Sequence, residues 1–145
     1  MKINIRIYGI LLAEFNGSKN LLVSKEFYNG FEFLKFPGGG LDFGEGIRDC
    51  LKREFLEELN LNVEIADLFY VNDFYQPSKF NDDQIVSIYY FVNANKDDLK
   101  EIIRKEKIAH LDGGKNCFKW LAWSEVDESL FDLPIDKVVI EKLLK

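Results

Sequence analysis

The chain has 145 residues, 47% of them hydrophobic and 14% aromatic, which suits one globular domain with a sizeable core over residues 1–145. The 19 basic and 25 acidic residues give a net charge of -6, which disfavours nucleic acid polymers as partners because no basic excess is available to neutralise phosphates. The apolar runs are too short to span a bilayer, so no membrane partner is expected.

Cysteine usage and the first residues indicate the compartment. Cys50 and Cys117 are too few and too far apart for a disulfide framework or a zinc cluster, which favours reduced core thiols. The first fifteen residues interleave charges with apolar residues, unlike the uninterrupted apolar core of a secretory signal. We therefore expect a cytoplasmic protein.

The first part of the chain has the pattern of β-hairpins. Apolar and polar residues alternate at the start of residues 3–12, which is the period of a strand. Asn16-Gly17 is a turn signal, and residues 21–23 are predicted to be the returning strand of a hairpin. A second turn at Asn29-Gly30 precedes a short predicted strand, residues 31–36.

A glycine-rich loop then leads into an acidic helix, predicted from about Glu45 to Leu59. Four apolar residues recur at every fourth position and would form the stripe that packs on a sheet: Ile47, Leu51, Phe55 and Leu59. Glu54, Glu57 and Glu58 fall at i, i+3 and i+4, so they share one face of the helix and repel one another. A hard divalent cation, which prefers carboxylate oxygens, would offset that repulsion.

The second half of the chain completes a mixed α/β pattern. It begins with a predicted extended segment (63–75) broken at Gln76-Pro77-Ser78, a strongly β-prone strand (85–92) and a charged segment (97–107) that forms a solvated helix or loop. A last strand (117–121), a helical turn capped by Ser124 with Asp127, and an amphipathic helix (135–144) after Pro134 are predicted to follow. This order predicts a mixed sheet with helices on both faces.

The stretch from Gly39 to Leu61 resembles the Nudix box, G-x5-E-x7-R-E-U-x-E-E-x-G-U, in which U is a bulky apolar residue. The residues on its fixed and apolar positions are Gly39, Glu45, Arg53, Glu54, Phe55, Glu57, Glu58 and Leu61. The one departure is Asn60, where the family has glycine. Asparagine is the next most tolerant residue of a left-handed backbone, so we expect Asn60 to end the helix in that conformation.

The resemblance implies a fold, a metal and residue roles. Nudix proteins are α/β/α sandwiches, and their box acids hold Mg2+ (or Mn2+) against a pyrophosphate. Carried over to this chain, the metal ligands are Glu54, Glu57 and Glu58, joined by the backbone carbonyl of Gly38. Glu54 could instead orient the attacking water. Arg53 either binds phosphate or, as we favour, pairs with Glu45 to hold the loop against the helix.

The resemblance also extends to a catalytic base and a base-binding surface. In the family an acid on a loop before the late strand often acts as the base, and Asp112 is the first candidate, with Asp82, Asp83 and Glu106 behind it. His110, the only histidine, has no partners for a catalytic triad. At most one or two of the following aromatic residues are expected to stack on a nucleobase, since packing is their default role: Phe74, Tyr75, Phe80, Trp120 and Trp123.

Together these features predict a metal-dependent hydrolase that cleaves the pyrophosphate linkage of a nucleoside diphosphate linked to another moiety. Pro77, sixteen residues after Leu61, favours ADP-ribose or a nucleotide sugar, because the family associates a proline there with ADP-ribose hydrolysis. The alternatives are a nucleoside triphosphate pyrophosphohydrolase that removes oxidised nucleotides, and a non-catalytic nucleotide-sensing domain. The complete set of box acids favours an enzyme. The expected partner is a small nucleotide, and a homodimer stays open.

Overall fold

The computed structural model describes residues 1–104, 107–111 and 114–145, and for residues 107–111 and 114 it describes the backbone alone. The described residues form, in chain order, β1 (Ile3–Phe15), β2 (Ser18–Tyr28), β3 (Phe31–Lys35), β4 (Gly38–Gly40), α1 (Ile47–Leu59), β5 (Glu64–Val71), β6 (Gln84–Asn93), α2 (Lys96–Arg104), β7 (Lys107–Leu111), β8 (Gly114–Ala122) and α3 (Pro134–Leu143). Two short 3-10 turns, Trp123–Glu125 and Glu128–Leu130, precede α3.

The sheet has two halves, one formed by β4, β5 and β6 and the other by β2, β3, β7 and β8, and the long strand β1 joins them. Its first part runs parallel to β6 along one edge and antiparallel to β4 along the other. From Leu12 onward it pairs with β2 instead, across the Asn16-Gly17 turn. The path through the sheet is β5-β6-β1-β2-β8-β7, with β3 added to β2 and β4 to β1. Because β1 changes partners, strands of the two halves can flank a common cavity.

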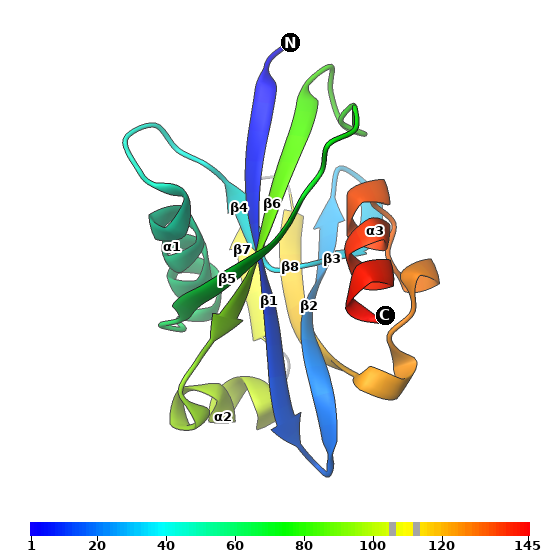
Figure 1. The fold of residues 1–145 in the computed structure, drawn as a ribbon. Helices are drawn as coiled ribbons and strands as arrows, with labels where there is room; N and C mark the ends of the chain where they lie inside the picture. Colours follow the sequence, from blue (N-terminus) through cyan, green and yellow to red (C-terminus); the bar gives the residue numbers. More distant parts are fainter. Residues whose placement is uncertain (105–106, 112–113) are drawn as a thin grey trace.

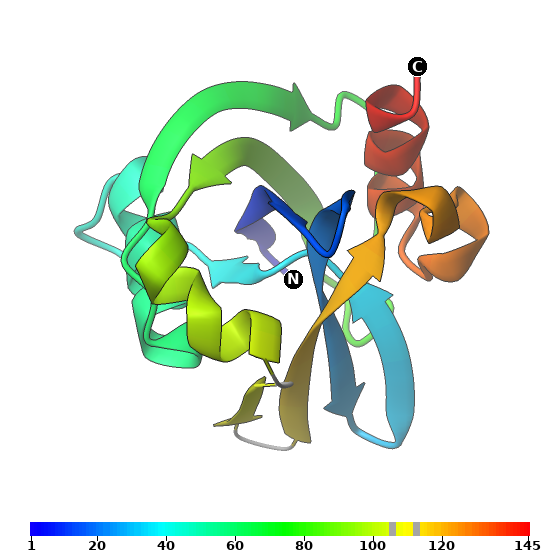
Figure 2. The same cartoon turned by 90° about the horizontal axis from the view of Figure 1, so that it is seen from below.

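Helices cover both faces of this sheet, as predicted. Figure 1 shows α1 and α3 on opposite sides of the strands, and Figure 2, the view from below, shows α2 on the side of α1. The apolar side chains form two buried clusters, one under α1 and α2 and one under α3. The mixed sheet between helices is the α/β/α arrangement that the box implied.

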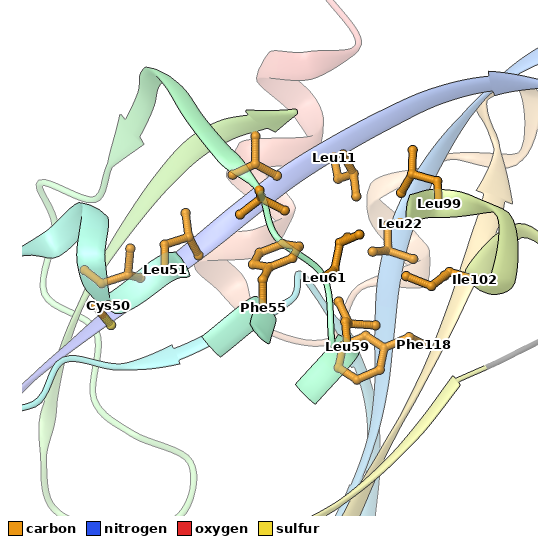
Figure 3. Packing of buried hydrophobic residues seen from close by; sticks show 13 residues of the cluster. Leu11, Leu22, Cys50, Leu51, Phe55, Leu59, Leu61, Leu99, Ile102 and Phe118 are labelled. Carbon is orange, nitrogen blue, oxygen red and sulfur yellow. The ribbon is translucent and has the colours of Figure 1, made fainter. Parts of the chain in front are cut away.

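The box helix α1 is fixed by its apolar stripe. Leu51, Phe55 and Leu59 are buried against strands of both halves of the sheet (Figure 3). Each such side chain contributes about 1.5–3 kcal/mol by leaving water. A Cβ on Gly9 of β1 would lie 2.6 Å from the Phe55 ring, so the glycine lets that ring rest directly on the strand.

Several boundaries differ from the sequence predictions. The helix α1 begins at Ile47 rather than Glu45, because the Glu45 carboxylate is engaged within the preceding loop. The charged segment forms helix α2, but it is not merely solvated, since Leu99 and Ile102 are buried. Asp127 stands at the N-cap of the second 3-10 turn but makes no side-chain cap hydrogen bond there. The short strands β4 and β7 were not predicted.

No helix among the residues described is both long and apolar enough to cross a membrane.

Candidate active site

Arg53 ties the glycine-rich loop to helix α1. Its Nε and Nη2 donate to the two carboxylate oxygens of Glu45 at 2.9 and 2.7 Å, and Nη2 also donates to the Gly40 carbonyl at 3.1 Å. Its Nη1 donates to Glu54 at 2.9 Å. The guanidinium, together with the backbone N–H of Asp42, lowers the pKa of Glu45 to about 2. The predicted pairing of Arg53 with Glu45 is therefore present, with two parallel bonds.

The glycines of β4 let charged side chains approach the strand closely. A Cβ on Gly39 would lie 2.5 Å from the carboxyl carbon of Glu54, so that carboxylate rests on the bare backbone. Gly38 has a φ of +148°, and a Cβ there would lie 2.0 Å from the Ile7 carbonyl oxygen. Glycine is thus required here for contact, which explains the loop composition physically.

The three box acids differ in exposure. The side chain of Glu54 is only 13% exposed, whereas that of Glu57 is 60% exposed and lies 3.3 Å from Arg53. Burial raises the pKa of Glu58 to about 7, although the charge of nearby Lys35 acts in the opposite direction. Burial also raises the pKa of Glu54. Glu54 and Glu58 are therefore held where an ionised carboxylate costs free energy unless a cation is nearby.

The donor chemistry of these residues fits a hard divalent cation. Every candidate ligand offers oxygen, which Mg2+ and Mn2+ prefer. The buried Oδ1 of Asn116, whose Nδ2 lies 3.5 Å from Glu58, has no hydrogen-bond partner in the described part of the chain. Within that part, no three His, Cys, Asp or Glu side chains converge closely enough to form a ready-made ligand cluster. Arg53 holds Glu54 and Glu57 instead, and the exposed Glu57 is the acid best placed to turn.

A cavity of about 290 Å³ lies between the two halves of the sheet. Its walls come from β1, β2, β3, β6, the segment 76–81 and the start of α3. The lining includes Arg6, Tyr8, Glu26, Lys35, Phe80 and Asp136. Lys35 and Arg6 also act electrostatically on Glu58, so the cavity begins near the box acids.

One wall of this cavity is aromatic. Phe80 lies with its ring centroid 5.5 Å from those of both Tyr28 and Phe33, and all three line the cavity, as does Pro77. Phe80 was among the aromatic candidates from the sequence. Tyr28 and Phe33 were not, because aromatic residues on a strand carry no signal that separates a cavity wall from the core.

The other aromatic candidates lie outside this cavity. Phe74 and Tyr75 are exposed. Trp120 packs edge-on against Phe15 in the core cluster under α1. Trp123 packs against the core cluster under α3, and Lys19 lies over its ring at 4.2 Å. These two tryptophans have packing roles.

The secondary candidates for a catalytic base are occupied elsewhere. Asp82 forms an ion pair with the N-terminal amine at 3.2 Å, and Asp83 accepts a hydrogen bond from the Lys2 backbone N–H. Asp112 and Glu106 lie outside the residues that the structure describes, and His110 is described by its backbone alone.

Sequence reasoning missed the charged residues of the cavity wall, among them Arg6, Lys35 and Asp136. Each stands inside an element whose apolar pattern predicts only packing. The sequence offers one clue, which is that each charged residue stands within an element that otherwise packs. Arg6 and Lys35 belong to strands, and Asp136 follows Ile135 at the start of an apolar helix.

Comparison with known proteins identifies the class. The model of the NUDIX domain family matches residues 5–143, nearly the whole chain. This chain therefore belongs to the NUDIX domain family.

Solved structures share the fold at low sequence identity. The E. coli ORF135 protein is 16% identical with a TM-score of 0.66, and the match covers 99% of this chain and 90% of that one. A C. elegans Ap4A hydrolase is 15% identical with a TM-score of 0.67, over 97% and 95% of the two chains. A MutT structure from a study of Aliivibrio salmonicida and Vibrio cholerae is 17% identical with a TM-score of 0.62, over 98% and 97%.

Proposed function

We propose that the protein is a divalent-metal-dependent hydrolase that cleaves the pyrophosphate linkage of a nucleoside diphosphate joined to another group. The observation that carries this proposal is the cavity beside the box acids, with its aromatic wall and its buried polar end. A pocket of this kind, mostly apolar with a few convergent polar groups, suits a nucleoside. The adjoining acids suit the metal that a pyrophosphate requires.

The roles at the cleavage end follow from the box. Glu57 and Glu58 would hold Mg2+ or Mn2+, with Glu54 as a further ligand or as the group that orients water, and the Gly38 carbonyl as an additional ligand. When bound, such an ion neutralises phosphoryl oxygens and makes a bound water more nucleophilic. Arg53 keeps Glu54 and the loop in place through its bonds to both. Asp112 remains the proposed base.

The nucleoside end is built from Phe80 and Asp136. Phe80 is 41% exposed and offers a ring face or edge for stacking. The Oδ2 atom of Asp136 is buried and has no hydrogen-bond partner among the described residues. An unpaired buried polar atom is costly, and a base N–H or ribose hydroxyl would satisfy it. Pro77 lines the same cavity, which supports a substrate of the ADP-ribose or nucleotide-sugar type.

A nucleoside triphosphate is the second candidate substrate. Its support is the likeness to MutT structures over nearly their whole length. A triphosphate would use the same metal ligands and the same nucleoside cavity, so the two candidates differ only in the leaving group.

Chromatographic detection of the nucleoside monophosphate formed from each member of a nucleotide panel tests the function. ADP-ribose, a nucleotide sugar and 8-oxo-dGTP are compared at equal concentration, with and without Mg2+. We expect turnover only with the metal, and the highest rate with ADP-ribose or the nucleotide sugar. A tenfold preference for the triphosphate, about 1.4 kcal/mol in transition-state binding, would reverse the choice of substrate. Equal rates in excess chelator would refute the role of the metal.

A further inference from the structure

A half-buried cation, Arg6, and a buried cation, Lys35, lie near one tyrosine in the cavity. Arg6 comes from β1 and Lys35 from the end of β3, so the two halves of the sheet supply one each. The Arg6 Cζ lies 5.8 Å from the ring centroid of Tyr8, and the Lys35 Nζ lies 5.7 Å from it. Lys35 is only 3% exposed. All three residues line the cavity.

Of these two cations, Lys35 has an ion-pair partner among the described residues and Arg6 does not. Lys35 forms an ion pair with Glu26 at 2.7 Å. Within the described part of the chain, the one hydrogen bond of the Arg6 guanidinium runs from Nε to the Tyr8 hydroxyl at 3.1 Å, and Arg6 forms no ion pair. The cavity lining holds the cations Arg6, Lys35 and Lys79 and the carboxyl groups of Glu26 and Asp136, so its cations outnumber its carboxyl groups by one. The charges of Glu26 and Glu54 act on Arg6 only from a greater distance, and a bound anion would give this half-buried cation a directly paired counter-charge.

The position of the cations tells which part of a substrate they would meet. A Cβ on Gly40 would lie 3.3 Å from Arg6 Nη1, and one on the adjacent Gly39 would touch Glu54. Arg6 and Glu54 thus approach β4 at two adjacent glycines. At the other end of the cavity, the charges of Lys35 and Arg6 also act on Asp136. The cations therefore lie between the box acids and the nucleoside end.

We propose that Arg6 and Lys35 form a metal-independent anion site that binds the phosphate attached to the nucleoside. The site rests on the proposed function only for its orientation along the substrate. The Nη atoms of Arg6 form a fork that matches phosphate oxygens, and Lys35 adds a point charge. The expected ligand is a nucleoside 5′-monophosphate, which is the part of the substrate that stays in the cavity after the anhydride is cleaved.

Calorimetric titration in excess EDTA tests this site without turnover. The four ribonucleoside 5′-monophosphates are titrated beside their nucleosides, so that the unknown base preference does not decide the result. We expect at least one monophosphate to bind tenfold or more tightly than its nucleoside, with the difference shrinking at high salt. If no monophosphate binds better than its nucleoside, the proposal is wrong.

Three variants assign the binding to the cations. Arg6→Gln should weaken binding of the monophosphate tenfold or more, leave binding of the nucleoside unchanged, and not lower the melting temperature, because no carboxylate loses a partner. Glu26→Gln should strengthen monophosphate binding, since Lys35 then loses its ion-pair partner. The control is Arg104→Gln on α2, an exposed arginine remote from the cavity lining, which should change nothing.

The outcomes separate this site from the proposed function. Unchanged monophosphate affinity in Arg6→Gln would overturn the proposal, and Arg6→Lys, which keeps the charge without the fork, gives a second measurement if Arg6→Gln does not fold. Metal-dependent turnover without binding in EDTA would leave the function standing and remove this site. Binding in EDTA without turnover of any nucleotide would support this anion site and refute the proposed function.

Discussion

Gly39 shows how one missing side chain positions the carboxylate of Glu54, a proposed metal ligand. A methyl group there would lie 2.5 Å from the Glu54 carboxyl carbon. We predict that Gly39→Ala costs no more than about 2 kcal/mol of stability, because the atom displaced is the mobile end of a side chain. Activity should fall at least tenfold, because Glu54 can no longer rest on β4. Urea unfolding and initial rates with Mg2+ measure the two effects.

The matched control is Gly46→Ala, where a methyl group would only approach the exposed Asp49 carboxylate at 3.3 Å. This variant should keep both stability and activity. Full activity in Gly39→Ala would show that the position of Glu54 does not matter for turnover.

Asn60 closes helix α1 in the conformation expected from the sequence. Its φ of 52° and ψ of 38° are left-handed, and its backbone N–H donates to the Leu56 carbonyl. Asn60→Gly should be neutral or stabilising by at most about 1 kcal/mol. Asn60→Val should clearly destabilise the protein, because a β-branched residue resists positive φ. Thermal unfolding compares the three proteins, and equal melting temperatures would contradict the left-handed cap.

Among individual residues, the sequence could predict those that belong to a spacing pattern. The spacing of Glu54, Glu57 and Glu58 indicates a shared face without any knowledge of the fold. Arg6 and Lys35 follow no such pattern, because their meaning depends on contacts with residues far away in the chain. That Arg6 has no ion-pair partner among the described residues is visible only in three dimensions.

Helix α1 combines a buried apolar stripe with a repulsive acidic face. We predict that Glu57→Gln keeps or slightly raises the metal-free melting temperature, since its exposed pair with Arg53 is worth little and its charge opposes that of Glu54. With Mg2+, turnover should fall by orders of magnitude and metal affinity should drop. Thermal unfolding, calorimetry with Mg2+ and initial rates measure these effects.

The control for this variant is Glu101→Gln on α2, a glutamate of similar exposure that also lies 3.3 Å from an arginine, Arg104. It should behave like the unchanged protein in all three measurements. Normal turnover by Glu57→Gln would rule out the proposed ligand role.

Elements with a side-chain period were predicted, and elements without one were missed. Strands β1, β2 and β6 are recognisable from alternation and β-branched residues, and the Asn-Gly turns have positive φ as expected. Strand β4 consists of three glycines and has no side-chain pattern, so it forms only because the chain passes along β1. Helix α2 was predicted to be solvated because its charged residues outnumber its buried ones, Leu99 and Ile102.

For the whole molecule, the parallel pairing of β1 with β6 has the largest consequence for function. It places Arg6 opposite Ser87, and Tyr8 opposite Tyr89, although more than eighty residues separate each pair. Helix α3 then brings Asp136 to the same cavity from the last tenth of the chain. Such a cavity could not be predicted from local patterns, because no segment contains more than a part of it.

Asp136 links this cavity to the pH dependence of folding. The Tyr89 hydroxyl donates to its Oδ1, and burial raises the pKa of the carboxyl to about 7. Tyr89, Lys35 and Arg6 act to lower this pKa, whereas the charge of Asp132 raises it. The ordinary pKa of an aspartate in an unfolded chain is about 3.9. Between these two values the folded protein keeps a proton that the unfolded chain has lost.

Protonated Asp136 therefore stabilises the fold fully below about pH 4, and this contribution is lost as the pH rises to about 7. The loss is at most about 1.4 kcal/mol per pH unit. Asp136→Asn stays neutral throughout, so its advantage in unfolding free energy over the unchanged protein should grow between pH 4 and 7 and then level off. Urea unfolding of both proteins at pH 4.5, 6 and 8 measures this difference. A constant difference across the range would mean that Asp136 does not carry the proton.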